Sequence, residues 1–88
     1  MDEGRAPRAR DLALAERCVT GDPAAQTALY RRELPRVRAT LRRLVKERAS
    51  IDDLAQETFF GVFRTLRHYR GEAALSTWID RCAMKTIH

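Results

Sequence analysis

Hydrophobic positions recur at three- and four-residue intervals along most of this chain, which is the spacing of amphipathic helices. Leu12, Ala15 and Val19 form the first such stripe. Asp11 can cap a helix of about ten residues here, and Gly21 can end it. The chain therefore begins its ordered part with a short helix.

A longer stripe predicts a second helix over about 23–46. Asp22-Pro23 supplies a cap and then a proline at the first helical position, where its missing N–H group costs nothing. Pro35 lies inside the helix and removes one backbone hydrogen bond, so we expect a kink near 31–35. The predicted core positions are Tyr30, Leu34, Val37, Leu41, Leu44 and Val45.

The pattern over 51–67 predicts a third helix, in which one large hydrophobic side chain lies on the polar face. Ser50 followed by Asp53 resembles a capping box at its start. Phe60 falls in the middle of the face opposite the predicted core. The core stripe consists of Ile51, Ala55, Phe59, Val62 and Leu66, and the polar face around Phe60 of Asp53, Gln56, Glu57, Arg64 and Arg67.

An aromatic ring surrounded by carboxylates and an amide suits a helix that docks on a basic, partly apolar partner. We therefore predict that Phe60 points outward and anchors a protein contact. The alternative is a packing aromatic that another part of the same chain covers.

A loop over 68–74, which contains Gly71, precedes a fourth helix from Leu75 or Ser76 to the end of the sequence. Alternating β-branched runs are absent, so the fold class is all-α, a compact domain of about four helices. The inner face of the last helix comprises Leu75, Ile79, Cys82 and Ala83, and a cationic outer stripe comprises Thr77, Arg81, Lys85 and His88.

Composition is typical of a single folded domain, with 44% hydrophobic and 33% charged residues among 88. Residues 1–10 are polar and basic and predict a flexible tail, which leaves 11–88 as the domain. The sequence stops without a helix-ending signal, so we expect a piece of a longer protein. A net charge of +5 is compatible with a polyanionic partner.

The sequence carries no export or membrane signal, because MDEGRAPRAR lacks an apolar centre and no long apolar run follows. A cytoplasmic location without membrane insertion is expected. Cys18 and Cys82 are then best interpreted as buried thiols, with a metal site or a disulfide as the alternatives.

Catalytic chemistry is hard to assemble from these residues. Neither His68 nor His88 has a nucleophile at a recognisable spacing, and Gly71 stands outside any phosphate-binding motif. Asp52 and Asp53 diverge by about 100° on a helix and cannot hold a metal as a pair. We expect no enzyme activity, no metal and no cofactor.

The loop and the last helix combine aromatic rings with cations, as proteins that hold single-stranded nucleic acid do. Tyr69, Arg70 and Trp78 supply rings and a guanidinium, while Ser76, Thr77 and the backbone near Gly71 could line a small polar pocket for an unstacked base. Three alternatives stay open. Trp78 can belong to the core, Ser76 can be an N-cap, and Arg81 with Lys85 can be a solvated stripe.

The segments DDLAQETFFGVFRTL and HYRGEAALSTWIDRCA together resemble region 2 of bacterial RNA polymerase sigma factors. The extracytoplasmic-function (ECF) group of the sigma-70 family is the most similar branch. Upstream, GDPAAQTALYRRELPRVRATLRRLV is similar to the opening helices of that region, so the resemblance covers about 11–88.

In that family the DDLxQExF helix docks on the clamp helices of the largest polymerase subunit. The loop and the next helix read the promoter −10 element as a melted, non-template single strand. The resemblance thus implies polymerase contacts at Asp52, Asp53, Gln56, Glu57 and Phe60, and DNA contacts at Tyr69, Arg70, Gly71, Ser76, Thr77, Trp78, Arg81 and Lys85.

Some residues depart from the family pattern. Lys85 stands where an asparagine is common, Met84 replaces the usual arginine, and Asp80 adds a negative charge. These changes affect the expected −10 preference. The second DNA-reading domain of the family, region 4, is absent from this sequence. The resemblance also implies an anti-sigma protein as a regulatory partner.

Two other functions remain compatible with the sequence. The first is a helical protein-interaction module that uses Phe60 and has no DNA role. The second is a nonspecific duplex-binding domain that uses the arginine-rich second helix, whose cations can otherwise be a solvated face.

Overall fold

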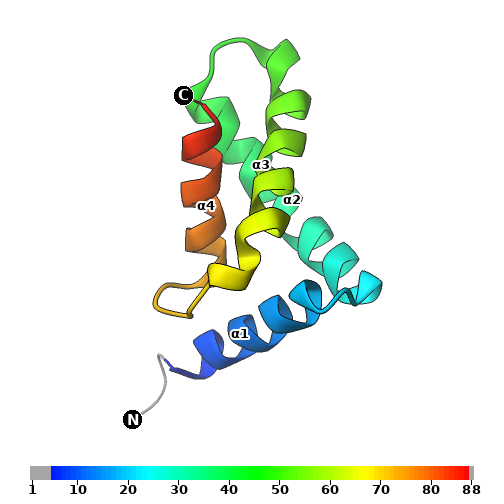
Figure 1. The fold of residues 1–88 in the computed structure, drawn as a ribbon. Helices are drawn as coiled ribbons and strands as arrows, with labels where there is room; N and C mark the ends of the chain where they lie inside the picture. Colours follow the sequence, from blue (N-terminus) through cyan, green and yellow to red (C-terminus); the bar gives the residue numbers. More distant parts are fainter. Residues whose placement is uncertain (1–4, 88) are drawn as a thin grey trace.

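The computed structural model describes residues 5–87, and over this range the fold is helical throughout. Figure 1 shows the four α-helices of the described residues: α1 (Arg5–Val19), α2 (Pro23–Leu44), α3 (Ile51–Thr65) and α4 (Leu75–Thr86). Short 3₁₀ turns at Arg48–Ser50 and Leu66–His68 flank α3. The predicted all-α class is confirmed.

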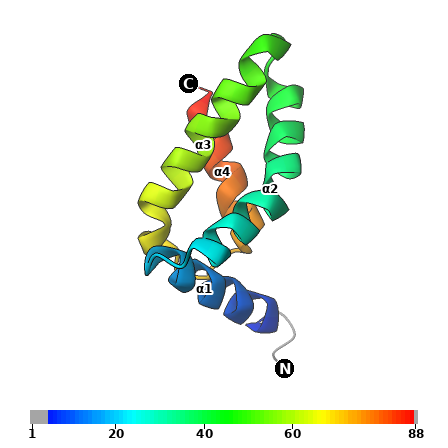
Figure 2. The same ribbon diagram turned by 90° about the vertical axis from the view of Figure 1, so that its right-hand side faces the viewer.

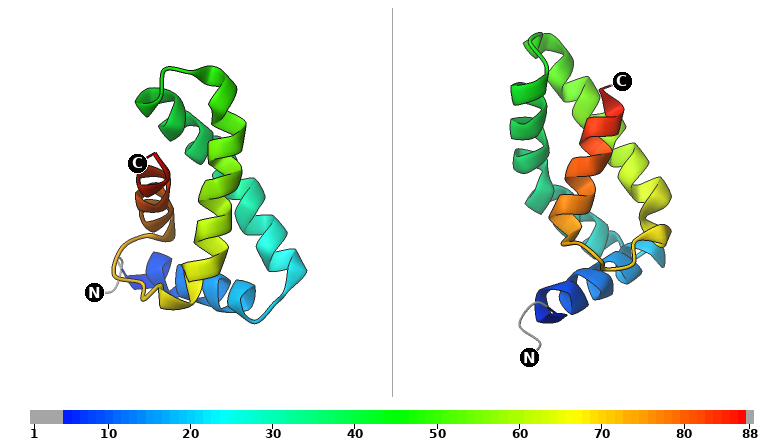
Figure 3. Two further views of the ribbon diagram at one scale, coloured as in Figure 1. Left: turned by 45° about the horizontal axis from the view of Figure 1, so that its top comes forward. Right: turned by 90° about the vertical axis from the view of Figure 1, so that its left-hand side faces the viewer.

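The helices α2, α3 and α4 pack side by side, and α1 crosses one end of them (Figures 1 and 2). The right-hand view of Figure 3 shows α4 lying between α2 and α3. One core joins all four helices and includes Leu29, Leu41, Val62, Leu75 and Ile79. Each flank of α4 therefore faces a different neighbour.

The first helix differs from its prediction. It begins at Arg5 instead of Asp11, so 5–10 are helical and not a tail, while 1–4 lie outside the described residues. Leu12 and Val19 are exposed, and Ala15 is buried together with Cys18. The buried side of α1 is therefore rotated relative to the predicted one, because α1 packs across the ends of other helices. The local sequence pattern does not encode this contact.

The second helix continues through Pro35, and its axis changes direction along its length, as the interior proline requires (Figure 2). The Asp22 cap is confirmed: its carboxylate accepts hydrogen bonds from the N–H groups of Ala24 at 3.0 Å and Ala25 at 3.4 Å. Val37 and Leu41 are buried as predicted, but Tyr30 and Leu44 are exposed.

The buried positions of α2 include Glu33, which is 1% exposed and was not predicted to be in the core. A charged residue does not continue a hydrophobic stripe, so the spacing of apolar residues gave no reason to expect Glu33 in the core. Its neighbours, described below, explain why it is buried.

The third helix matches its prediction closely. All five predicted core positions are buried, and the polar face is turned outward. The capping box is wrong, because Ser50 makes no side-chain cap hydrogen bond. The α-helix ends at Thr65, slightly before the predicted end, and Gly61 and Thr65 are joined by a hydrogen bond from the threonine hydroxyl to the glycine carbonyl at 2.7 Å.

The fourth helix starts at Leu75 after Ala74, which offers no side-chain cap. Its cap comes from a distant residue: Asp11 of α1 accepts a hydrogen bond from the Leu75 N–H group at 2.8 Å. No acidic residue occupies the first turn of α4, so this carboxylate also meets the positive end of the helix dipole. Within 5–87, no helix is long and apolar enough to cross a membrane.

Candidate functional site

The outer side of α3 carries the group that the sequence predicted. Phe60 is 68% exposed, more than any other large hydrophobic side chain among the described residues. Its exposure confirms that it points outward. We call the exposed set the α3 face, and it consists of Asp52, Asp53, Gln56, Glu57 and Phe60.

The Phe60 ring has a cation on one side and an apolar hollow on the other. The guanidinium carbon of Arg64 lies 5.3 Å from the ring centroid, within cation–π range. A shallow hollow of about 530 Å³ extends from Phe60 across Phe59 and Phe63 to Tyr30 of α2. The Tyr30 ring packs edge-on against Phe59, with centroids 4.8 Å apart, and stays 37% exposed. Tyr30 therefore borders this surface instead of filling the core.

One member of the α3 face is shared with α2. The Asp52 carboxylate forms an ion pair of 2.6 Å with Arg38, while its own side chain remains 71% exposed. The pair fixes this carboxylate against α2, at the border of the face. Asp53, Gln56 and Glu57 are exposed alongside it.

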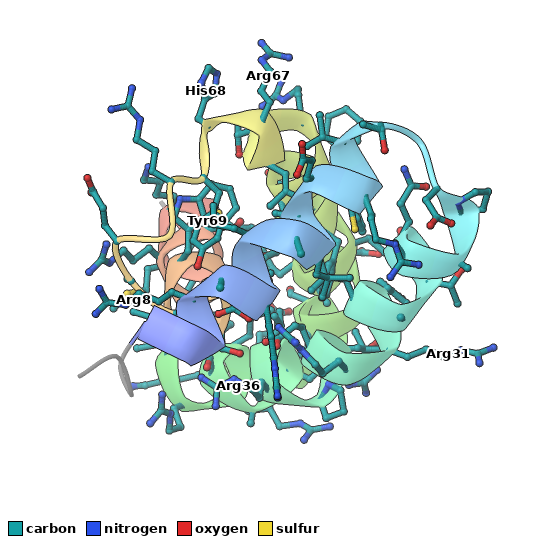
Figure 4. All side chains as sticks on the ribbon, turned by 90° about the horizontal axis from the view of Figure 1, so that it is seen from below. Arg8, Arg31, Arg36, Arg67, His68 and Tyr69 are labelled. Carbon is teal, nitrogen blue, oxygen red and sulfur yellow. The ribbon has the colours of Figure 1, made fainter. Side chains whose placement is uncertain are left out.

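The loop before α4 is held from inside by Tyr69. This residue is buried, its hydroxyl donates a hydrogen bond of 2.6 Å to the Ala73 carbonyl, and its ring meets Trp78 edge-on with centroids 5.7 Å apart. Burial raises the pKa of the phenol, with a further contribution from the Asp11 carboxylate. Figure 4 places Tyr69 between α1 and α4. The Tyr69 ring is therefore packed inside the domain, where it shapes the loop, and its DNA contact stays a prediction.

Gly71 is buried at the turn of the same loop, with φ of +78°. A Cβ atom at this position would lie 2.8 Å from Cδ1 of Leu12 on α1. Both the backbone angle and the contact require glycine here. Gly71 therefore serves the path of the loop and its packing on α1.

A groove of about 840 Å³ runs between α3 and α4, and we call it the α3–α4 groove. The exposed cations Arg81 and Lys85 rise from its α4 wall, beside the half-buried Trp78. Thr77 and Arg70 are exposed nearby, on α4 and in the loop. The residues around the groove are Glu57, Thr58, Phe60, Gly61, Arg64, Thr65, His68, Trp78, Arg81, Cys82, Lys85 and Thr86.

Several residues of this groove were missed as site candidates, and two of them carry basic side chains. Arg64 and His68 belong to the α3 side, and they bring cationic or titratable groups opposite Arg81 and Lys85. Figure 4 shows the side chains of Arg67 and His68 directed away from the helices. The helical wheel had placed Arg64 beside Phe60, but only the packing of α3 against α4 reveals that both walls are basic.

Ser76 and Asp80 lie on the other flank of α4, toward α2. The Ser76 hydroxyl donates a hydrogen bond of 2.7 Å to Oε2 of Glu33, and Arg36 donates one of 2.8 Å to Oδ2 of Asp80. Ser76 is thus inside the helix and is not its N-cap. The unusual acidic residue at 80 pairs with α2, so its charge is balanced within the domain.

Both thiols are free, and they differ in setting. Cys18 is buried in the core, whereas Cys82 is half-buried in the wall of the α3–α4 groove. Burial raises the pKa of each thiol above its ordinary value. Across residues 5–87, no three His, Cys, Asp or Glu side chains gather where a metal ion could bind.

Comparison with known proteins agrees with this arrangement. Residues 29–88 match the family model of Sigma-70 region 2. The chain is 40% identical over 76 residues to the ECF RNA polymerase sigma-E factor of Haemophilus influenzae, an alignment that covers 86% of this chain and 40% of the relative.

Two further relatives give similar values. The RNA polymerase sigma-H factor of Pseudomonas aeruginosa is 32% identical over 77 residues, with 88% of this chain and 40% of the relative covered. The ECF RNA polymerase sigma-E factor of Escherichia coli K12 is 34% identical over 76 residues, with 86% and 39% covered. The chain thus spans about 40% of the length of these curated relatives. The matched family model and these relatives together show that the chain belongs to the sigma-70 region 2 family, as a region 2 domain of an ECF sigma factor.

Proposed function

We propose that this transcription initiation factor domain docks on the clamp helices of core RNA polymerase through the α3 face and binds the promoter −10 element as a single strand through α4 and its preceding loop. The observation that carries the proposal is the 68% exposure of Phe60 within an acidic face, next to a groove with basic walls. Two chemically different surfaces lie on neighbouring helices.

Docking through the α3 face follows from its composition. A large exposed ring that loses its contact with water on binding supplies apolar area, and residues of this kind dominate interface energies. Asp53 and Glu57 supply negative charge around the ring, which favours a basic partner and speeds the encounter. Clamp helices with basic side chains and apolar patches would satisfy both requirements.

Binding of a single strand follows from the mixture of groups along α4. Arg70, Arg81 and Lys85 can follow the phosphates, and the exposed part of Trp78 offers a face to a base. Thr77 is exposed and can donate or accept a hydrogen bond. Tyr69, Gly71 and Ser76 are assigned a different part, which is to shape the loop and the first turn of α4 that would surround an unstacked base.

The mechanism is binding without covalent chemistry. Polymerase would hold the α3 face while the loop and α4 capture a base of the non-template strand and so favour the melted −10 element. We extend the proposal to the bacterial cytoplasm as the location and to an anti-sigma protein as a partner that competes for one of these surfaces. Full promoter selection would require region 4, the second DNA-reading domain of the family.

Two experiments test the proposal. In a pull-down with core RNA polymerase, wild type should bind, Gln56→Ala should bind more weakly, and Phe60→Asp should fail. Equal binding by all three would refute the docking surface.

The DNA part is tested with a fluorescent single strand and its duplex. Replacing Arg70, Arg81 and Lys85 by alanine should remove salt-sensitive single-strand binding. No effect would favour a protein-interaction module without a DNA role, and a preference for duplex would favour the arginine-rich face of α2.

A further inference from the structure

A buried polar network joins α2 to the flank of α4 that faces away from the groove. Its centre is Glu33, which is 1% exposed. Oε2 of Glu33 accepts hydrogen bonds from the Ser76 hydroxyl at 2.7 Å and from Nε of Arg32 at 2.8 Å. Taking a carboxylate out of water is costly unless such partners compensate it, so the network fixes Glu33 and Ser76 in one arrangement.

A second polar contact between α2 and α4, which we also call a tie between these helices, lies one helical turn further along α4. Arg36 donates to Oδ2 of Asp80 at 2.8 Å and lies 3.5 Å from Oε1 of Glu33, an ion pair rather than a hydrogen bond. Residues 76 and 80 share one flank of α4, as residues 33 and 36 share one side of α2. Two ties a turn apart resist rotation of α4 about its own axis, which a single tie would allow.

The start of α4 is held from a third direction. Asp11 of α1 accepts the hydrogen bond of the Leu75 N–H group and lies 4.0 Å from Arg32, which also contacts Glu33. The first turn of α4, directly after the loop, is therefore connected to both α1 and α2. None of these contacts involves the flank of α4 that faces α3.

We propose that Glu33 is a positioning residue for DNA reading: by holding Ser76 it fixes the rotation of α4, and with it the direction of the side chains along the α3–α4 groove. Successive residues differ by about 100° around a helix, so even a fraction of one step turns these side chains away from the groove. This inference rests on the proposed single-strand binding. Glu33 is buried and touches no DNA, so its influence must pass through α4.

The test compares base discrimination by variants that differ only within the network. The measured quantity is the ratio of dissociation constants of the chain for two fluorescein-labelled single strands, which differ at the base that wild type discriminates most. Glu33→Leu removes the acceptor at similar volume, and its discrimination should fall about tenfold, the equivalent of one hydrogen bond to a charged group. Glu33→Gln keeps an acceptor for Ser76 and should retain most of the discrimination.

A second variant keeps the test decisive if Glu33→Leu does not fold. Arg36→Met cuts the tie to Asp80 at a half-exposed position, and its discrimination should also fall. Arg31→Met is the matched control for the lost charge, because Arg31 is exposed on the same helix and points away from the other helices (Figure 4). It should weaken binding to both strands equally and leave their ratio unchanged.

The outcomes separate the two proposals. Folded Glu33→Leu or Arg36→Met with wild-type discrimination would overturn the positioning role and leave the proposed function intact. A wild-type chain that binds neither single strand would overturn the proposed DNA function itself. Core polymerase binding, which uses the α3 face, should be the same for wild type and all these variants.

Discussion

The helices α3 and α4 bury similar apolar stripes in one core, yet their outer sides differ in charge. On α3 an exposed ring stands among carboxylates, whereas α4 exposes Arg81 and Lys85 beside Trp78. Their mutual contact is neutral, with a 3.0 Å hydrogen bond between the hydroxyls of Thr58 and Thr86. Packing therefore specifies how the helices meet, and the outward residues specify what each can bind.

The two helices also differ in how firmly polar groups hold them. The flank of α4 toward α2 carries the Glu33 network, while α3 is tied to α2 by polar groups mainly through the exposed pair of Asp52 and Arg38. Exposed ion pairs contribute little to stability, so α3 depends on its apolar core. Under the proposed function, the network would keep the side chains of α4 directed at the bound strand.

The largest expected effect concerns polymerase binding by the α3 face. Phe60→Asp should weaken binding to core RNA polymerase by about thirtyfold, because hot-spot aromatics contribute at least about 2 kcal/mol. Thermal stability should change little, since the ring is mostly exposed. Leu44→Asp, at an exposed apolar site on α2, is the control and should bind polymerase like wild type. Equal losses in both variants would point to nonspecific repulsion.

A somewhat smaller effect is expected on the α4 side. Replacing Arg81 and Lys85 by alanine should reduce single-strand affinity about tenfold and lower the slope of log K against log salt by about 1.4, because each phosphate contact contributes about 0.7. The matched control replaces Arg42 and Arg43, exposed cations on α2. Fluorescence anisotropy over a salt series measures both. A larger loss in the control pair would assign DNA binding to α2.

Substitutions of two glycines, one in the loop before α4 and one in α3, should change the stability of the domain in opposite directions. Gly71→Ala should destabilise the domain by about 1 kcal/mol, because φ is positive and Leu12 occupies the space of the new methyl group. Gly61→Ala, in α3, meets open space and should stabilise it by about 0.5–1 kcal/mol. Urea denaturation followed by circular dichroism measures both changes. Shifts of the same sign would contradict this description of the loop.

The smallest effect concerns pH. The hydrogen bond from Arg17 and those from the N–H groups of Ala25 and Ala24 lower the pKa of Asp22. A lowered folded-state pKa means that the stabilisation is complete above the ordinary aspartate range and is lost as pH falls through the lowered value. Acidification should therefore reduce the melting temperature of wild type more than that of Asp22→Asn. Parallel curves for the two proteins would exclude this contribution.

Local periodicity was sufficient for α3 and for Thr77, Arg81 and Lys85 of the outer stripe of α4, because one side of each helix is apolar and the other polar over several turns. The fourth residue of that stripe, His88, lies outside the described residues. The exposure of Phe60 followed directly from that pattern. Tyr69 could not be interpreted in this way, since an aromatic in a loop is equally suited to stacking on a base and to packing inside. Its burial and its hydrogen bond to Ala73 show that the ring packs inside this domain.

Two of the differences share a physical cause, which is contact between residues far apart in the chain. Asp11 was interpreted as the cap of its own helix and instead caps α4, 64 residues away. Glu33 was missing from the predicted core because its partner Ser76 lies 43 residues further along. Sequence patterns describe the faces of helices well, but they do not say which faces meet.

The central claim is that this domain has two binding surfaces on adjacent helices, the α3 face and the cations of α4, with Glu57 and Phe60 at the border between them. One crossed measurement tests it: the affinities of Phe60→Asp and Arg81→Glu for core RNA polymerase and for a fluorescent single-stranded DNA. We predict that Phe60→Asp loses polymerase and keeps DNA, and that Arg81→Glu loses DNA and keeps polymerase. Loss of both partners by either folded variant, or of neither by both, would contradict the claim.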